Sequence, residues 1–124
     1  MTKGFTIMAL VMLGLLHGPV AQAAPSTSVQ IEISFPLGFI DGSRCDFLRN
    51  GNWYSAQAAQ VHVRDKYKAL LARNQVDTSE QFIERAAAQS SLSGKPYAIR
   101  CGGGATVPTQ QWLLEELARY RTFP

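Results

Sequence analysis

The chain contains only two cysteines, Cys45 and Cys101, and their pairing is the strongest constraint on its fold. Because the N-terminus has the features of an export signal, both cysteines would reach an oxidising compartment, where disulfides form and persist. A disulfide between them would stabilise the fold by about 4 kcal/mol in the chain-entropy description. The alternative is a reactive thiol pair or a set of metal ligands. Neither cysteine has a third ligand nearby and the spacing is not C-x-x-C, so we expect the disulfide and no metal site.

Residues 1–23 have the features of a cleavable signal peptide. Lys3 gives a short positive start, residues 5–16 carry no charge, and Ala21-Gln22-Ala23 offers the small side chains that signal peptidase accepts. The alternative is an uncleaved anchor, but about 12 uncharged residues fall short of the roughly 20 that span a bilayer. We therefore expect cleavage after Ala23, a single periplasmic domain over residues 24–124, and no stable membrane anchor after cleavage.

Composition and charge exclude several classes of protein. With 46% hydrophobic and 17% charged residues, the chain lacks the bias of collagen-like or strongly charged disordered sequences. The net charge is +3, and removal of residues 1–23 would remove one lysine and leave +2. That charge is too small to favour a nucleic-acid partner. No glycine-rich phosphate loop precedes a helix, and we expect no cofactor.

The predicted fold is α+β, with a two- to three-stranded antiparallel sheet, about four helices packed on it, and one disulfide as a brace. The strongest local signal is Asn50-Gly51, a typical hairpin turn. Ser55 is expected to cap one helix, and Thr78 with Gln81 forms a capping box for the next. The expected elements, in chain order, are a helix over about 35–41, strands over 45–49 and 52–54, helices over about 55–73 and 78–89, a strand over 97–101, and a helix from Thr109 with Leu113, Leu117 and Tyr120 facing inward.

Residues 29–41 admit two interpretations. Apolar and polar residues alternate over 29–35, which is typical of a strand, and Pro36 interrupts this pattern. Other apolar residues in the stretch have helical spacing, and Ser34 would cap this helix with Pro36 in its first turn. The apolar residues with helical spacing are Ile33, Leu37 and Ile40. We expect the short helix over about 35–41.

His62 is the single histidine of residues 24–124, so a histidine-based mechanism would have to use it. Asp65 could orient its ring, and a serine of the 90–93 loop, such as Ser90 or Ser91, could be the nucleophile of a small periplasmic hydrolase. The alternative is a histidine at the rim of the core that ties its helix to a neighbouring loop. Because no serine has the surroundings of a nucleophile elbow, we expect the structural role and assign no catalytic residue.

A basic and aromatic set of residues could form a shallow site for an anionic ligand or a sugar. Its basic members are Arg49, His62, Lys66, Arg73 and Arg100, and Trp53 and Tyr54 add aromatic surface. The candidate binding surface is the rim that contains Arg49, Tyr54, His62, Lys66 and Lys95. The alternative is a solvated rim beside core aromatic residues. We expect a non-catalytic binding or interaction module of the bacterial envelope, with a ligand or protein partner whose identity the sequence does not give.

Taken together, the motifs resemble the YfeK-like family of exported bacterial proteins, whose domain has no known function. The resemblance covers residues 45–101 well and the rest of the chain loosely. It is carried by Cys45-Asp46-Phe47-Leu48-Arg49-Asn50-Gly51, Tyr54-Ser55-Ala56, His62-Val63-Arg64, Lys66-Tyr67, Thr78, Glu80, Phe82-Ile83-Glu84-Arg85-Ala86-Ala87 and Ser90-Ser91-Leu92-Ser93-Gly94-Lys95-Pro96-Tyr97. The resemblance implies an exported, single-domain envelope protein of Gram-negative bacteria. It implies no activity or cofactor and offers no active site to carry over.

Overall fold

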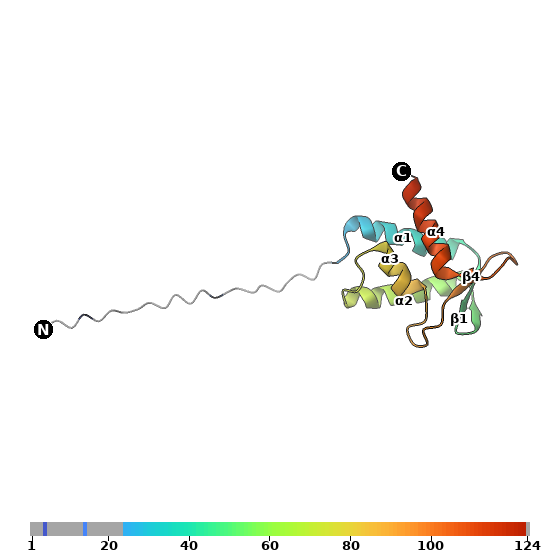
Figure 1. Ribbon diagram of the computed structural model, residues 1–124, viewed down its shortest axis with the longest axis horizontal. Helices are drawn as coiled ribbons and strands as arrows, with labels where there is room; N and C mark the ends of the chain where they lie inside the picture. The colour runs from blue at the N-terminus through green and yellow to red at the C-terminus, as the bar shows by residue number, and fades with distance from the viewer. Residues whose placement is uncertain (1–3, 5–13, 15–23, 124) are drawn as a thin grey trace.

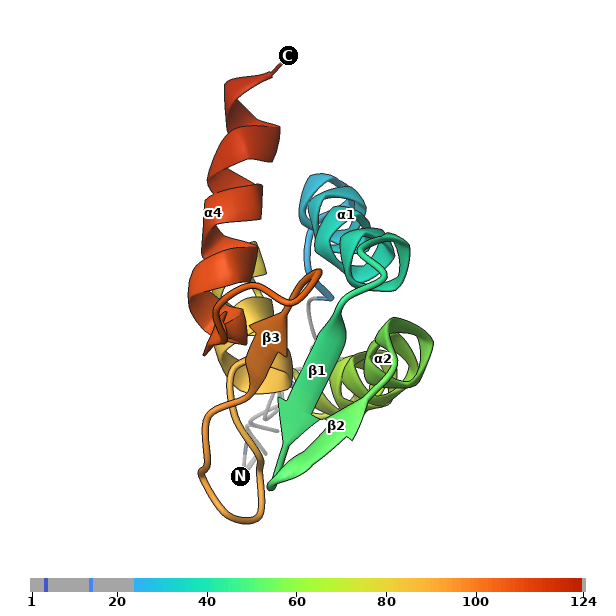
Figure 2. The ribbon, with the colours of Figure 1, turned by 90° about the vertical axis from the view of Figure 1, so that its right-hand side faces the viewer.

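An antiparallel sheet of four short strands, in the order β2-β1-β3-β4, joins the two halves of the chain (Figures 1 and 2). The computed structural model describes residues 24–123 together with Gly4 and Gly14, so the expected signal peptide lies almost wholly outside the described residues. The elements are α1 (Thr27–Gly42), β1 (Asp46–Arg49), β2 (Asn52–Tyr54), α2 (Ala56–Ala72), α3 (Ser79–Phe82), the π-helical segment η1 (Ile83–Ala87), β3 (Ala98–Arg100), β4 (Val107–Pro108) and α4 (Thr109–Thr122). In Figure 2 the sheet faces the viewer, and α1 and α2 extend behind it.

The α+β prediction is confirmed, with four strands where two to three were expected. The additional strand is β4, which has only two residues and pairs with β3. Two residues are too few to produce a periodic pattern, so β4 has no signature in the sequence.

The hairpin and the disulfide are also as predicted. Asn50 and Gly51 both have positive φ, 48° and 81°, as the tight hairpin turn between β1 and β2 requires. Cys45 and Cys101 are bonded, with their Cα atoms 4.5 Å apart. The bridge lies just outside the paired ends of β1 and β3, so it closes the central strand pair of the sheet.

Helix α1 differs from the prediction because it begins at Thr27, well before residue 35. Ser26, and not Ser34, caps it by accepting a hydrogen bond from the Val29 amide. Pro36 lies inside the helix, where it removes one backbone donor but is itself buried. The buried face consists of Ile33, Pro36, Leu37 and Ile40. Ile31, which the alternating pattern placed with the apolar face, is 58% exposed, so the helical period explains the stretch and the strand period does not.

Helix α2 begins after Ser55, whose hydroxyl accepts from the Ala58 amide, as predicted. Thr78 caps α3 by accepting from the Gln81 amide, but the Gln81 side chain accepts from the amide of Asp77, one residue before the position that a capping box uses. The single helix expected over 78–89 divides into α3 and the π-helical η1. Such segments put an extra residue into a helical turn and commonly occur at functional sites.

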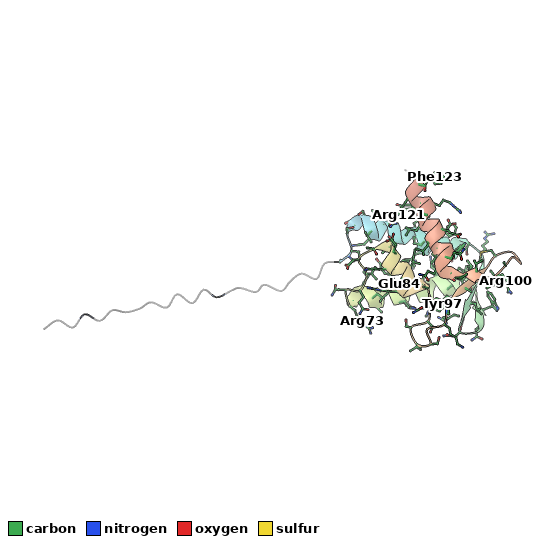
Figure 3. All side chains as sticks on the ribbon, in the orientation of Figure 1. Arg73, Glu84, Tyr97, Arg100, Arg121 and Phe123 are labelled. Atoms are coloured by element: carbon green, nitrogen blue, oxygen red, sulfur yellow. A yellow bond between two sulfur atoms is a disulfide. The ribbon has the colours of Figure 1, made fainter. Side chains whose placement is uncertain are left out.

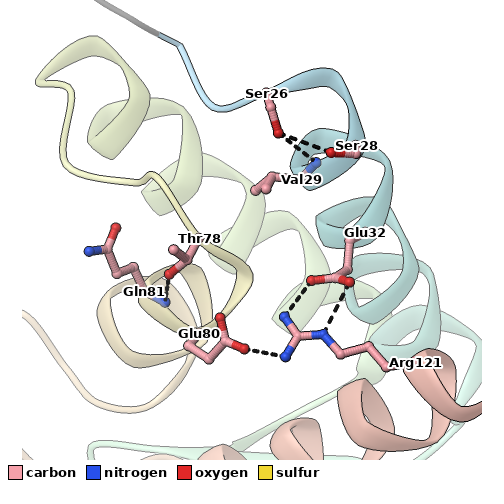
Figure 4. Close-up of polar contacts among 8 residues, drawn as sticks. All are labelled: Ser26, Ser28, Val29, Glu32, Thr78, Glu80, Gln81 and Arg121. Carbon is pink, nitrogen blue, oxygen red and sulfur yellow. Dashed lines mark hydrogen bonds and ion pairs between the residues drawn. The ribbon is translucent and has the colours of Figure 1, made fainter.

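Helix α4 begins at Thr109, as predicted, with Leu113 and Leu117 buried and the Tyr120 ring packed 4.6 Å from that of Phe35. Near its end, Arg121 ties α4 to α1 and α3 (Figure 4). Its guanidinium donates twice to Glu32, at 2.7 and 3.2 Å, and once to Glu80. These contacts lower the pKa values of both carboxyl groups.

The core lies where α1, α2, η1 and α4 meet the inner face of the sheet. Its most deeply buried large side chains are Ile33, Ile40, Val76, Phe82, Ile83, Ile99 and Leu113. Among the described residues, no helix combines the length and apolar character needed to cross a membrane.

Candidate functional site

A groove of about 480 Å³ lies between the β1–β2 hairpin, one side of α2 and the loop at 90–92. Four of the five residues predicted to bind a ligand line it, and they come from three elements. These residues are Arg49 at the end of β1, Tyr54 at the end of β2, and His62 and Lys66 on α2. The fifth, Lys95, does not line the groove and is exposed.

Tyr97, just before β3, is at the centre of the polar contacts in the groove. Its hydroxyl lies 3.1 Å from His62 Nε2 and accepts a hydrogen bond from Lys66 Nζ at 3.3 Å. Lys66 also donates to the carbonyl oxygen of Gln89 at 2.8 Å and lies over the Tyr97 ring. Since Lys66 donates to the hydroxyl oxygen, the Tyr97 proton is free to donate to a neutral imidazole. Figure 3 labels Tyr97 at the sheet end of the molecule, far from Arg73 at the other end of α2.

The groove is electropositive. The guanidinium of Arg49 lies 4.3 Å above the Tyr54 ring, and among the described residues it makes no hydrogen bond or ion pair. Burial, and then the charges of Arg49 and Lys66, lower the pKa of His62, while the charge of Asp65 opposes this shift. Burial and Arg49 also lower the pKa of Lys66. Burial and the neighbouring positive charges therefore both disfavour the protonated forms of His62 and Lys66.

A narrow slot of about 30 Å³ adjoins the groove on the side of the core. The groove and the slot share four residues at their junction, which are Arg49, Tyr54, His62 and Tyr97. Most other residues of the slot are apolar, and they include Phe47, Val63 and Ala87 of the core. One polar side chain, that of Thr109, also lines it.

The serines of the 90–93 loop have structural contacts. Ser90 is 5% exposed, and its Oγ accepts from the amides of Leu92 and Ser93 and, at 3.4 Å, from the Asn50 side chain. Ser93 Oγ donates to Asn50 Oδ1 at 2.6 Å, so the loop is attached to the hairpin turn. Ser91 lines the groove. Within the described part of the chain, His62 has Tyr97 as its hydrogen-bond partner and makes no hydrogen bond to a serine.

Sequence reasoning missed Tyr97 and Thr109 as site residues. The paired cysteines carried a signal for Tyr97. The register of β1 and β3 pairs Phe47 with Ile99, and its continuation in both directions places Cys45 opposite Cys101 and Arg49 opposite Tyr97. Thr109 had no such signal, because its position depends on β4.

The whole fold described above corresponds to one protein family. Residues 27–121 match the model of a family of unknown function, DUF5329. The chain belongs to this family. It is also 45% identical over 51 residues to an uncharacterised protein named YfeK from Salmonella typhimurium strain LT2. That match covers 41% of this chain and 41% of the relative. The predicted resemblance to YfeK is thus confirmed, and no solved structure matches the chain.

Neither the family description nor the relative's name assigns an activity. Within residues 24–123, no group of three or more His, Cys, Asp or Glu side chains is arranged to hold a metal ion. The functional argument therefore depends on the groove itself.

Proposed function

We propose that the protein is an exported, non-catalytic binding module of the Gram-negative envelope whose groove holds an anionic group. The observation that carries the proposal is the cluster of half-buried Arg49, His62 and Lys66 around buried Tyr97. It offers two positive charges and several donors, and none of the described residues that line the groove is Asp or Glu. A charged group that is partly removed from water and lacks a counter-ion favours binding of the opposite charge.

The hydrogen bonds of the cluster favour binding over hydrolysis. A nucleophilic serine needs a base within hydrogen-bond reach and donors for the developing oxyanion. The His62 ring contacts Tyr97, whose phenol has a raised pKa because it is buried. Ser90 uses its oxygen to accept three hydrogen bonds that fix the loop.

Isothermal titration calorimetry of the full chain with inorganic phosphate tests the proposal by measuring the affinity. Lys66→Gln should weaken binding roughly tenfold, the value of one charge-assisted hydrogen bond. The matched control is Lys68→Gln, which removes the same charge from an exposed position of α2 outside the groove and should leave the affinity unchanged. Equal affinities of the two variants would contradict the proposal.

A second measurement distinguishes a binding module from a hydrolase. The purified chain is incubated with p-nitrophenyl acetate, and the proposal predicts no turnover above the rate of the His62→Gln variant. Turnover that disappears in both His62→Gln and Ser91→Ala would instead favour catalysis.

The exported location has its own test. We propose cleavage after Ala23, because Ala21 and Ala23 fit the small-residue requirement of signal peptidase. Intact-mass spectrometry of a periplasmic fraction should find a chain that begins at Ala24. A periplasmic chain that retains residues 1–23, or an absence of the protein from that fraction, would contradict export with cleavage.

A further inference from the structure

Thr109 places a hydrogen-bonding group in an otherwise apolar slot. The residue is 2% exposed, and its Oγ1 has no hydrogen-bond partner among the described residues. A buried hydroxyl without a partner is costly, so Thr109, which lines the slot, has a hydrogen-bonding capacity that the protein does not use. The slot has room for only one or two non-hydrogen atoms.

Tyr97 sets the distance between this hydroxyl and the cationic groove. The Tyr97 carbonyl accepts from the Thr109 amide at 3.0 Å, so the backbone of Tyr97 lies beside Thr109. The Tyr97 hydroxyl, at the other end of the same side chain, contacts His62 and Lys66. The two ends of the cavity are therefore separated by about the length of one tyrosine. A three-carbon chain with an acid at one end and a hydroxyl at the other has a similar length.

The groove end of the cavity suits a phosphate. Arg49 has a guanidinium fork without a hydrogen bond among the described residues, and Lys66 uses two of its three donors within the protein. Two fixed positive charges match the charge of a phosphate monoester, and a phosphate has enough acceptor oxygens to use both groups and the Ser91 hydroxyl in the groove wall.

We propose that the ligand is a glycerophosphoryl group, with its phosphate between Arg49 and Lys66 and its terminal hydroxymethyl group in the slot, where it bonds to Thr109. This inference rests on the proposed function, because it names the anion that the groove holds. The carbon of the hydroxymethyl group contacts the apolar slot walls, and its oxygen supplies the missing partner of Thr109. Leu92, which lines the groove and is 99% exposed, would lose water contact when the rest of the ligand lies beside it.

Calorimetric titration of the full chain with three phosphates tests the ligand class. Glycerol 3-phosphate should bind roughly fivefold more tightly than propyl phosphate, which has the same three-carbon chain without the terminal and the secondary hydroxyl group. Propyl phosphate should in turn bind more tightly than inorganic phosphate, because its terminal methyl group can occupy the apolar slot. Equal affinities of all three would overturn this inference and leave anion binding intact. Failure of all three to bind would overturn the proposed function as well.

Two variants test whether the slot causes the preference for glycerol 3-phosphate. Thr109→Val keeps the side-chain shape and should abolish the preference for glycerol 3-phosphate over propyl phosphate, without a lower melting temperature. Ala58→Leu changes an exposed position of α2 that lines the slot. It should lower the affinities of glycerol 3-phosphate and propyl phosphate to that of inorganic phosphate. The control is Gln57→Leu, at the neighbouring position of α2 outside the slot, which should leave all three affinities unchanged. A preference that survives both Thr109→Val and Ala58→Leu would contradict the assignment.

A glycerol attached to a phosphate occurs free in solution as a monoester and in the phosphatidylglycerol headgroup as a diester with one negative charge. Vesicle sedimentation separates these sources. Binding to phosphatidylglycerol vesicles, but not to phosphatidylcholine vesicles, with competition by glycerol 3-phosphate, would assign the lipid source. Binding of glycerol 3-phosphate alone would assign the free source. Vesicle binding that Thr109→Val and glycerol 3-phosphate leave unchanged would contradict recognition of the headgroup by this cavity.

Discussion

Removal of the disulfide should cost a large part of the stability of this domain. The bridge closes a sequence separation of 56 residues, which corresponds to about 4 kcal/mol in the chain-entropy description. A domain of this size has roughly 5–15 kcal/mol in total. The suitable change is the double variant Cys45→Ala and Cys101→Ala, because Cys45 is buried and a serine hydroxyl there would add a desolvation cost.

The assay is guanidinium unfolding of the oxidised chain and of the double variant, followed by tryptophan fluorescence. We expect the free energy of unfolding to fall by about 4 kcal/mol, and treatment of the wild-type chain with a reductant to have the same effect. The variant should also change the environment of His62, since the bridge helps to fix the register that places Tyr97 opposite Arg49. A loss below about 1 kcal/mol would refute the view that the bridge is the main constraint on the unfolded chain.

Two further side chains give stability predictions. His62→Ala should lower the free energy of unfolding by about 1–2 kcal/mol, because the Tyr97 hydroxyl loses a hydrogen-bond partner. His62→Gln should have a smaller effect, since its amide can replace that partner. Thermal melts of the two variants and the wild-type chain measure both effects. The pKa of His62 is lowered in the fold, so stability should be complete above pH 6.5 and decline as the pH falls toward the lowered value, a slope that His62→Gln abolishes. Arg121→Ala should cost about 1 kcal/mol, since its ion pairs with Glu32 and Glu80 are partly exposed. Because both carboxyl pKa values lie below 4.5 in the fold, urea titrations should show the Arg121 contribution disappearing as the pH falls through that range.

The parts of the fold that local chemistry determines were predictable from the sequence. Asn50-Gly51 requires positive φ at two successive residues, and the two cysteines of the chain have one possible pairing with each other. Ser55 and Thr78 act through hydrogen bonds within three residues of themselves. The turn and capping signals depend on a few adjacent residues, and the disulfide follows because the chain has no third cysteine.

The errors occurred where tertiary packing decides the structure. Helix α1 was expected to begin only near residue 35, because Val29 to Phe35 fit the strand period, but Ile33 and Ile40 are both buried and only a helix places both on one face. The residues of α2 and the hairpin that line the groove could be selected from the sequence, because charged and aromatic side chains near a predicted core are candidates for ligand contacts. Thr109 was not, because its hydroxyl matters only where β4 and α4 close the slot.

The most direct test of the anion site is an NMR titration of the His62 imidazole with and without phosphate. The His62→Gln variant identifies the signal, because the chain has a second histidine, His17. In the free protein, burial and the charges of Arg49 and Lys66 hold the pKa of His62 below 6.5. A phosphate bound between those cations offsets their charge, so the pKa should rise when phosphate is added, and Lys68→Gln should show the same rise. An identical pKa with and without saturating phosphate would contradict the account.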